Sequence, residues 1–299
     1  MTAWGTFALA AATSSAVAWL AARAAPRAGL VDDPAARPDR KRQARPVPAV
    51  GGLAILAGLA IARAIPGPLW VGLGTAFLLG TIDDRRRGGL SPRALLAGQA
   101  IVAASLVAVG WRVGDGPPLL FAAASFLAVI AAVNAVNTFD NADGAATSVG
   151  IVGLLAGSPL LAAPLVGFLP WNLLGNRTSK PVAYLGNAGS HVLGVLLLVD
   201  PIGRYALALP LLDLARLSVV RFLAGSRPWI GDRRHLAHRL QEAGLATAPI
   251  ALLLAALAAP AVLGSRFGLL AAVGGVLLTA VLVAATILAT PCSAPGADR

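Results

Sequence analysis

Four aspartates in this sequence of 299 residues stand where apolar runs end. Asp83 and Asp84 close one such run, and Asp140 and Asp143 follow a later one. Paired carboxylates repel a phosphate unless a cation lies between them, and Mg²⁺ is commonly held by one or two carboxylates together with phosphate oxygens. These residues therefore predict a divalent-cation site for a phosphorylated substrate. For Asp83 and Asp84 alone, a solvated helix end neutralised by neighbouring arginines would be the favoured explanation.

The second pair of aspartates belongs to a polar segment that ends an otherwise apolar run. Asn134 and Asn137 are three residues apart, so both project from one face of a helix, and Asp140 and Asp143 repeat this spacing. Polar groups at this depth in an apolar segment are energetically costly and usually mark a site. Helix capping is the alternative, structural role.

Two further groups of residues suit the binding of an anion. Small residues, including Gly189 and Ser190, open an apolar run, where the backbone N–H groups of a helix N-terminus can bind an anion. Arg234, His235 and His238 form the second group. The two histidines could form a weak metal pair, a proton donor or phosphate contacts. A polar helix at the membrane surface explains them equally well.

Basic residues give the chain a formal net charge of +11, and they lie between the apolar runs. Arg40 and Lys41 belong to the first of three arginine-rich loops, and the others are 85–93 and 221–239. This pattern indicates membrane topology rather than nucleic-acid binding, because cytoplasmic loops of membrane proteins carry an excess of Lys and Arg. The loops could also bind anionic lipid head groups, and the cations of segment 40–52 could bind phosphates.

The composition excludes a water-soluble globule. Apolar residues make up 57% of the chain and charged residues only 12%, whereas a soluble domain carries about 25% charged residues. The apolar runs predict an all-α, polytopic bundle of about 10–11 transmembrane helices in a single domain, residues 1–299. Positive charges follow the first run and none precedes it, so we expect an uncleaved span with the N-terminus outside. The predicted spans are 3–22, 50–66, 68–82, 92–110, 118–137, 145–157, 159–174, 188–200, 203–222, 248–263 and 267–290.

Two predicted hairpins, 145–174 and 188–210, are too short for two full crossings, since each crossing needs about 20 residues. They could be re-entrant, tilted, or shielded by neighbouring helices. If 145–174 were a single span, Asn187 would lie on the opposite side of the membrane from Asp83. The predicted cytoplasmic loops, which bring the polar segments to one surface, are about 23–49, 83–92, 138–144, 175–188 and 223–247.

Five segments, in this order, resemble the motifs of the polyprenyl-phosphate N-acetylhexosamine-1-phosphate transferase family, over roughly residues 32–245. Segment 40–52 is similar to R-K-x-H-x-x-P-x-P-x-x-G-G, and segment 80–84 to G-x-x-D-D. Segments 134–144, 186–190 and 232–240 are similar to N-x-x-N-x-x-D-G-x-D-G, G-D-x-G-S and D-R-x-H-L-H-H-x-L. The last segment resembles the N-acetylglucosamine branch of the family. The sequence departs from these patterns at Gln43, Asn141, Asn187 and Ala237.

The resemblance implies transfer of N-acetylhexosamine-1-phosphate, with GlcNAc-1-phosphate the expected group, from a UDP-sugar to polyprenyl phosphate. The implied products are polyprenyl-diphosphate-sugar and UMP, the implied cofactor is Mg²⁺ or Mn²⁺, and the implied place is the cytoplasmic face of the cell membrane, in cell-envelope glycan synthesis. The implied catalytic residues are Asp83, Asp84, Asp140, Asp143 and His235. The implied metal ligands are Asp84, Asp143 and Asn187. The implied substrate-binding residues are Arg40, Lys41, Asn134, Asn137, Gly189, Ser190, Arg234 and His238.

The departure at Asn187 leaves alternatives open. Asparagine keeps a carbonyl ligand but removes a negative charge where the family pattern has aspartate, which should weaken the binding of a hard cation. An active transferase is the first hypothesis. The second is a catalytically impaired relative that binds lipid-linked intermediates or a pathway partner. A transporter is the third and least favoured, because its polar residues would be spread through the bilayer midplane, whereas the aspartates here gather at one surface. Membrane lipids are expected partners, nucleic acid is not, and a homodimer is left open.

Overall fold

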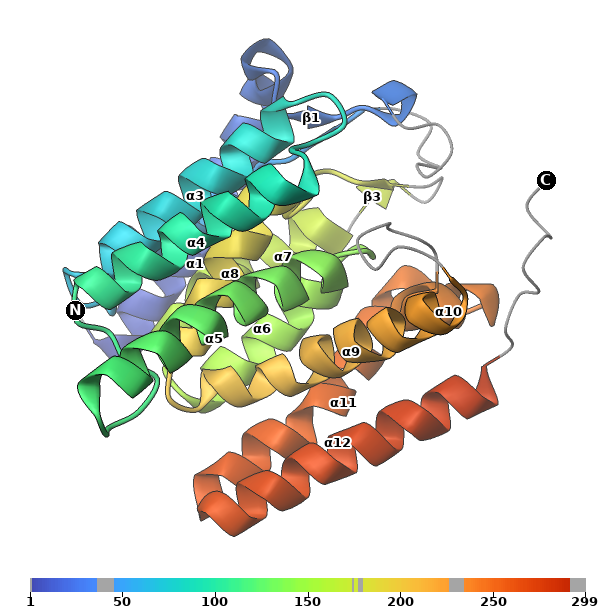
Figure 1. Ribbon diagram of the computed structural model, residues 1–299. Helices are drawn as coiled ribbons and strands as arrows, with labels where there is room; N and C mark the ends of the chain where they lie inside the picture. Colours follow the sequence, from blue (N-terminus) through green and yellow to red (C-terminus); the bar gives the residue numbers. More distant parts are fainter. Residues whose placement is uncertain (1, 37–45, 174, 177–179, 226–233, 291–299) are drawn as a thin grey trace.

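The computed structural model describes residues 2–36, 46–173, 175–176, 180–225 and 234–290, and it is built almost wholly of helices (Figure 1). Each of the eleven predicted spans is helical. The α-helices are α1 (Ala3–Ala28), α2 (Gly51–Ala62), α3 (Leu69–Arg85), α4 (Pro92–Ala108), α5 (Pro118–Phe139), α6 (Ala145–Ala156), α7 (Pro159–Leu173), α8 (Gly186–Val199), α9 (Ala208–Leu223), α10 (Leu236–Glu242), α11 (Thr247–Gly264) and α12 (Leu269–Ala289). The 3₁₀-helices are η1 (Pro34–Ala36), η2 (Gly203–Leu207) and η3 (Ser265–Phe267).

Short strands connect loops that are far apart in the sequence. β1 (Val31–Asp32) pairs antiparallel with β2 (Val47–Pro48), and β3 (Gly175–Asn176) pairs antiparallel with β4 (Lys180–Pro181). A parallel bridge then joins Ala49 to Tyr184. The segment that follows α1 and the segment that precedes α8 therefore lie side by side.

Several helices can cross a bilayer by their own length and composition. Within the described residues these are Ala3–Ala28, Pro118–Phe139, Thr247–Phe267 and Leu269–Ala289. The prediction of an all-α polytopic membrane protein is confirmed. The remaining apolar helices are shorter, so the number of about 10–11 crossings and the outside position of the N-terminus stay predictions.

Helix α8 lies at the centre of the bundle, with every residue from Ala188 to Leu198 buried. It packs against α2, α3, α5, α6 and η2. Glycines allow the closest approaches, since a Cβ at Gly80 of α3 would collide with the α8 backbone, and one at Gly52 of α2 would lie 2.8 Å from the Gly189 nitrogen. A central helix of 14 residues needs no full bilayer thickness, because its neighbours shield it from lipid.

The short segment 145–174 is a hairpin of two helices, which excludes the single-span alternative. α6 has 12 residues and α7 has 15, which at 1.5 Å per residue gives lengths of about 18 and 22 Å. α7 returns to the end where α6 begins, because the Asn172 Oδ1 atom accepts a hydrogen bond from the Gly144 N–H at 3.1 Å. The start of α8 therefore lies at the same end of the molecule as the end of α3.

A buried carboxylate lies in the turn at the opposite end of α8. Asp200 is only 3% exposed, and its Oδ1 atom accepts hydrogen bonds from the N–H groups of Ile202 and Gly203. It shapes the turn between α8 and η2. In α9, Asp213 and Arg216 form an ion pair, with the Arg216 Nη2 atom 2.8 Å from Asp213 Oδ1.

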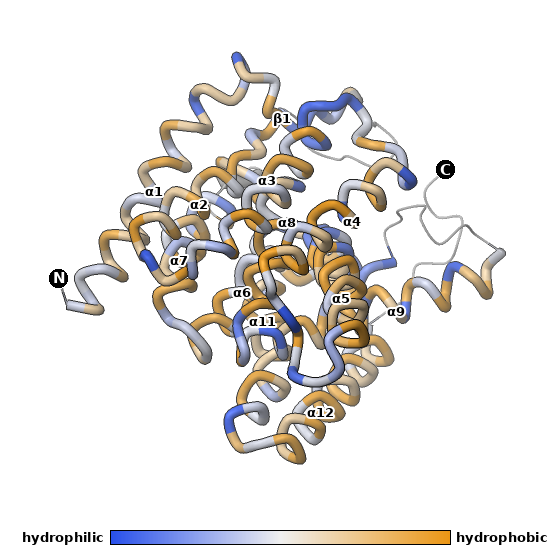
Figure 2. The backbone as a smooth tube through the Cα atoms, turned by 60° about the vertical axis from the view of Figure 1, so that its left-hand side comes forward, coloured by the Kyte–Doolittle hydropathy of each residue, from blue (hydrophilic) through white to orange (hydrophobic). Residues whose placement is uncertain are grey.

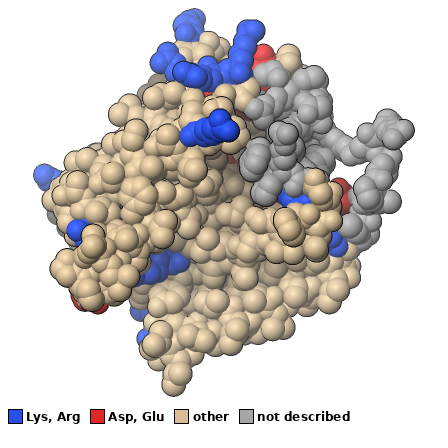
Figure 3. Space-filling model, in the orientation of Figure 1, with Lys and Arg blue, Asp and Glu red and all other residues tan. Residues whose placement is uncertain are grey.

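Charge and hydropathy are unevenly distributed over the molecule. Figure 2 shows hydrophobic residues along most of each helix and hydrophilic residues mainly near the helix ends. Lys and Arg side chains gather at the end of the molecule that carries β1, at the top of Figure 3. This end also contains the polar residues described next.

Candidate active site

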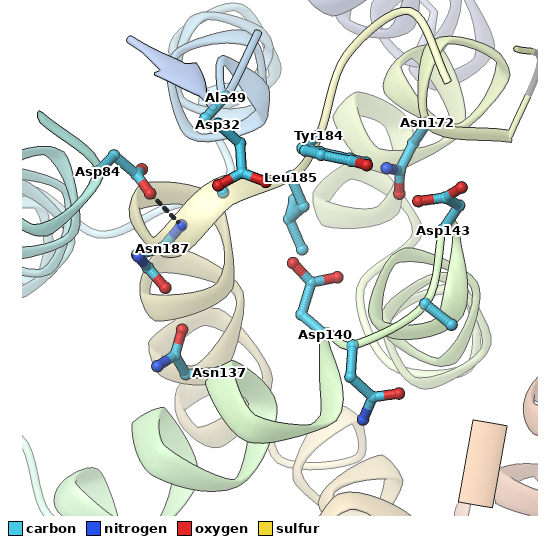
Figure 4. A pocket seen from close by; sticks show the side chains of 13 residues that line it. Asp32, Ala49, Asp84, Asn137, Asp140, Asp143, Asn172, Tyr184, Leu185 and Asn187 are labelled. Carbon is cyan, nitrogen blue, oxygen red and sulfur yellow. Dashed lines mark hydrogen bonds between the residues drawn. The ribbon is translucent and has the colours of Figure 1, made fainter. Parts of the chain in front are cut away.

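A cavity of about 270 Å³ lies where α3 and α5 end and α6 and α8 begin (Figure 4). Its wall is rich in carboxylates and carboxamides from segments far apart in the sequence. The lining residues that carry such groups are Asp32, Asp84, Asn137, Asp140, Asn141, Asp143, Asn172 and Asn187. Four carboxylates in one cavity favour a cationic or cation-bound ligand, because they repel one another in its absence.

Asp84 fastens α3 to the N-terminus of α8. Its two carboxylate oxygens accept hydrogen bonds from the N–H groups of Asn187, at 2.9 Å, and Ala188, at 3.0 Å. The partial positive charge of a helix N-terminus favours a carboxylate in this position. The anion-binding role predicted for the start of α8 is thus partly filled by the protein itself, since the Asn187 and Ala188 N–H groups already bind Asp84.

Asp140 and Asp143 project into the cavity from the loop between α5 and α6, and Asp32 projects from β1 on the opposite side (Figure 4). Enclosure in the protein, together with the negative charges of Asp143 and Asp84, raises the pKa of Asp140 to about 8. Without a cation, Asp140 therefore holds a proton over much of the neutral range. The surroundings of this cavity thus do not keep all of its carboxylates ionised at neutral pH.

Asn172 of α7 holds this loop in place. Its Oδ1 atom accepts hydrogen bonds from the Gly144 N–H and, at 2.9 Å, from the Thr147 hydroxyl, and its Nδ2 atom donates to the Ala183 carbonyl oxygen at 3.3 Å. Gly144 has a φ of +76°, which side chains rarely adopt, and a Cβ there would collide with Leu173. The hydrogen bonds of Asn172 and the backbone conformation of Gly144 thus fix the position of Asp143, the residue before Gly144.

Asn137 and Asn187 lie on the α5 and α8 side of the cavity. The Ser190 hydroxyl donates to Asn137 Oδ1 at 2.8 Å, which links the two helices. In Figure 4 the Asn137 and Asn187 carboxamides face one another across the cavity wall. Gly189 serves the close packing of α8 on α2, because a Cβ there would lie 3.0 Å from the Gly52 nitrogen.

Three lining residues were missed in the sequence: Asp32, Asn172 and Tyr184. Asp32 arrives through the pairing of β1 with β2, and Tyr184 through a hydrogen bond from its N–H to the Pro48 carbonyl oxygen at 2.8 Å. Their signals were weak, because Asp32 precedes a basic loop and Asn172 is a single amide at the end of an apolar run.

Other predicted residues do not line the cavity. Asp83 is buried, and its Oδ1 atom accepts a hydrogen bond from the Leu90 N–H in the loop after α3. Asn134 pairs with Gln99 of α4 through two hydrogen bonds of 2.8 and 3.2 Å. The structure gives both residues contacts that hold helices and loops, and their roles in catalysis and substrate binding stay predictions.

The histidine segment lies at the start of α10, in contact with α9, rather than in the cavity wall. The His235 Nδ1 atom is 3.0 Å from Asp213 Oδ2, and the His238 Nδ1 atom is 3.0 Å from Gln241 Oε1. The Arg234 carbonyl oxygen accepts a hydrogen bond from Arg216 at 2.5 Å. The predicted substrate contacts of Arg40 and Lys41 lie outside the described residues.

The cavity fits a divalent cation only if the cation is also bound by ligands from outside the protein. Among the described residues, no three His, Cys, Asp or Glu side chains are grouped closely enough to hold a metal ion by themselves. The carboxylates of Asp84 and Asp143 and the amide of Asn187 nevertheless line one cavity, and Mg²⁺ often takes one or two carboxylates and completes its shell with water and substrate phosphate oxygens. The residues thus fit a cation that arrives with, or is completed by, a phosphorylated substrate.

Comparison with known proteins points in the same direction. No protein-family profile matches the chain. The chain is similar to curated proteins named undecaprenyl-phosphate alpha-N-acetylglucosaminyl 1-phosphate transferase. The one from Yersinia pestis is 27% identical, with 85% of this chain and 82% of the relative covered. The one from Thermotoga maritima is 31% identical, covering 68% and 71%, and the one from Escherichia coli K12 is 27% identical, covering 76% and 73%.

Proposed function

This chain belongs to the family of undecaprenyl-phosphate N-acetylglucosaminyl 1-phosphate transferases, and we propose on that basis that it transfers GlcNAc-1-phosphate from UDP-GlcNAc to undecaprenyl phosphate. The reaction gives undecaprenyl-diphosphate-GlcNAc and UMP. The observation that supports this function most directly is the single cavity in which Asp84, Asn137, Asp140, Asp143 and Asn187 converge.

The bond changes follow from the substrates. A phosphate oxygen of the lipid attacks the phosphorus that bears the sugar, the bond from this phosphorus to the bridging oxygen of the diphosphate breaks, and UMP leaves with that oxygen. Such transfers depend mainly on in-line positioning and on neutralisation of spreading negative charge. A Mg²⁺ or Mn²⁺ ion, held by Asp84, Asp143 and the Asn187 amide oxygen, would supply that neutralisation.

Asp140 has a separate part in this proposal. With a pKa of about 8 in the free protein, it is largely protonated at neutral pH. A neutral carboxyl group can donate a hydrogen bond to a phosphate oxygen, where a carboxylate would repel it. Asp140 thus lets a doubly charged lipid phosphate approach a cavity that already holds carboxylates.

We place the site on the cytoplasmic face of the cell membrane. Among the described residues, Lys and Arg side chains gather at the end of the molecule that holds the cavity, and such residues accumulate on the cytoplasmic side of membrane proteins (Figure 3). UDP-sugars are cytoplasmic metabolites, so a protein that uses one must bind it on that side.

Release of UMP tests the proposal directly. The purified protein in liposomes with UDP-GlcNAc, undecaprenyl phosphate and Mg²⁺ is expected to release UMP in step with lipid-diphosphate-sugar. Asp143→Asn should lower the rate by on the order of 100-fold, the usual cost of removing one electrostatic group from such a site. Full activity of Asp143→Asn would contradict the assignment of the cavity.

Asn187 favours a second candidate, a relative that binds lipid-linked intermediates without turning them over. This candidate predicts binding of UDP-GlcNAc or lipid without UMP release. Absence of turnover in the wild type, with turnover gained in Asn187→Asp, would support it against the active transferase.

A further inference from the structure

A second cavity, of about 360 Å³, lies beside the site but shares none of its lining residues. It is formed by the last part of α1, by β2, by the end of α7 and by the segment that follows β4. Its wall is aromatic, apolar and rich in proline, and it contains one cation. The main lining residues are Trp19, Arg23, Pro46, Pro48, Trp171 and Val182.

The exposed side chain of Arg23 stacks on a neighbouring ring. Its guanidinium carbon lies 3.7 Å from the centre of the Trp19 ring, one helical turn earlier on α1. Within the described part of the chain, Arg23 makes no hydrogen bond or ion pair with another residue. A stacked guanidinium keeps its N–H groups free at the edge, where they can bind a phosphate with two hydrogen bonds.

Hydrogen bonds hold the opposite wall. The Trp171 indole N–H donates to the Ser15 hydroxyl at 2.8 Å, which ties α7 to α1. The Trp171 carbonyl oxygen accepts hydrogen bonds from the N–H groups of Val182 and Ala183, at 3.0 and 3.1 Å. The cavity is therefore built by side chains and backbone that are already in place.

The position of the cavity indicates what occupies it. α1 runs along the edge of the bundle (Figure 2), and its apolar side chains are exposed, with Leu9 at 44% and Leu20 at 57%. In a membrane protein such a surface faces lipid, and Trp and Arg at the end of a span lie at the level of the lipid head groups. An anion with attached apolar chains is therefore the ligand that both the charge and the lining select.

We propose that this cavity binds the head group of an anionic glycerophospholipid from the bilayer, with Arg23 on its phosphate and Trp19 and Trp171 against its glycerol and first methylenes. Its volume is at the lower end of the roughly 300–1,000 Å³ typical of small-molecule sites. Undecaprenyl phosphate also ends in a phosphate, but as the acceptor it must reach the carboxylate cavity, and this wall shares no lining residue with that cavity. A bilayer phospholipid is therefore the occupant.

Binding here reaches the active site through a shared strip of backbone. Pro48 lines the second cavity, and its carbonyl oxygen accepts the Tyr184 N–H, while Ala49 and Tyr184 line the active-site cavity. A lipid that packs against this strip stabilises the wall from which Tyr184 projects.

The test is lipid binding by the purified full-length protein, measured by native mass spectrometry with short-chain phosphatidylglycerol and phosphatidylcholine. Phosphatidylglycerol should bind more tightly than phosphatidylcholine. Arg23→Gln should weaken its binding about fivefold to tenfold, as expected for one arginine near a membrane surface. Arg266→Gln makes the same change at an exposed position on η3, directly after α11, and should leave phosphatidylglycerol binding unchanged. Arg23→Lys should give an intermediate loss of binding.

Three outcomes would overturn the proposal. These are phosphatidylglycerol binding that Arg23→Gln leaves unchanged, equal binding of both lipids, and stronger Arg23-dependent binding of undecaprenyl phosphate, which would make the cavity an acceptor site. Displacement of the lipid by millimolar inorganic phosphate would also count against it, because the apolar wall would then contribute nothing. The readout does not depend on UMP release, so it is distinguishable from a failure of the proposed transferase activity.

Discussion

Asn187 stands where the family pattern has an aspartate, and its surroundings show what that change does. The Asn187 N–H binds Asp84, and the carboxamide faces Asn137. A further carboxylate here would join a cavity in which the pKa of Asp140 is already raised to about 8. Asparagine therefore lowers the repulsion among the carboxylates, at the cost of a weaker attraction for a divalent cation.

Asn187→Asp should shift the Mg²⁺ dependence of the enzyme. The added charge strengthens cation binding, so half-maximal UMP release should need about tenfold less Mg²⁺, which corresponds to roughly 1.4 kcal/mol. A Mg²⁺ titration of UMP release for the wild type and the variant measures this. Asn137→Asp, which adds the same charge on the facing helix, is the comparison. An unchanged midpoint in Asn187→Asp would show that the residue lies outside the cation's reach.

Asp140 gives the protein a pH dependence of stability when divalent cations are absent. Its pKa of about 8 in the folded protein lies above the ordinary value near 4 of the unfolded chain. Between about pH 4 and 8 the unfolded chain releases this proton while the folded protein keeps it, so the contribution of Asp140 to stability falls as pH rises. Asp140→Asn should remove this loss.

The measurement is thermal unfolding in detergent with EDTA, from pH 5 to 9. The melting temperature of the wild type should fall relative to that of Asp140→Asn, up to about pH 8, and then run parallel to it. Mg²⁺ with UDP-GlcNAc should reduce the difference. A constant difference across the range would contradict the raised pKa.

Neighbouring aspartates show the limit of reasoning from residue types. Asp83 and Asp84 have the same side chain and lie next to each other, yet Asp84 lines the cavity and Asp83 binds the Leu90 N–H. Successive residues on a helix point about 100° apart, and the sequence does not say which direction faces α8. The close contact of Gly80 with α8 decides it, and this is a tertiary contact.

At the scale of elements, each apolar run corresponds to a helix, and the ends of the helices differ from the predicted ends by a few residues. α1 continues past residue 22 to Ala28, and α3 past residue 82 to Arg85, because polar residues can extend a helix beyond the apolar core. The composition predicted the short hairpin 145–174, but it could not predict how this hairpin is accommodated or that α8 is central. Both depend on which helices shield which, and hydropathy along the chain does not contain that information.

The loop between α5 and α6 depends on a side chain from another element. Asn172→Ala should leave the Gly144 N–H, the Thr147 hydroxyl and the Ala183 carbonyl oxygen without their partner, since all three bind the Asn172 side chain. Each buried polar group left without a partner lowers the stability of the folded protein by about 1–3 kcal/mol. The variant should unfold more readily and, because Asp143 loses its support, should raise the KM for UDP-GlcNAc.

A matched variant separates these two effects. Gln99→Ala also removes a buried carboxamide, but one that pairs with Asn134 between α4 and α5, away from the cavity. It should lower the melting temperature without the rise in KM. If both variants changed KM equally, the effect of Asn172 would be a general loosening of the bundle rather than a loss of loop position.

On the scale of the whole molecule, the distribution of charge gives the orientation in the membrane. Arg85 ends α3, and Arg86 and Arg87 follow it, at the end where the active-site cavity opens. The loop at the far end, between α4 and α5, carries Arg112 and Asp115. The excess of Lys and Arg in short loops sets the orientation of a membrane protein, and the side with the excess faces the cytoplasm. The end that carries the carboxylate cavity is therefore expected to be cytoplasmic, as the proposed use of a UDP-sugar requires.

Cysteine labelling in intact cells tests this orientation with two exposed positions at opposite ends. In a Cys292→Ser background, Asp115→Cys should react with a membrane-impermeant maleimide added to whole cells, and Arg87→Cys should react only after the membrane is opened. Both side chains are exposed in the structure, so a failure to react reports the barrier rather than burial. The reverse pattern would place the cavity outside the cell, where no UDP-sugar is supplied, and the transferase proposal would fail together with the orientation.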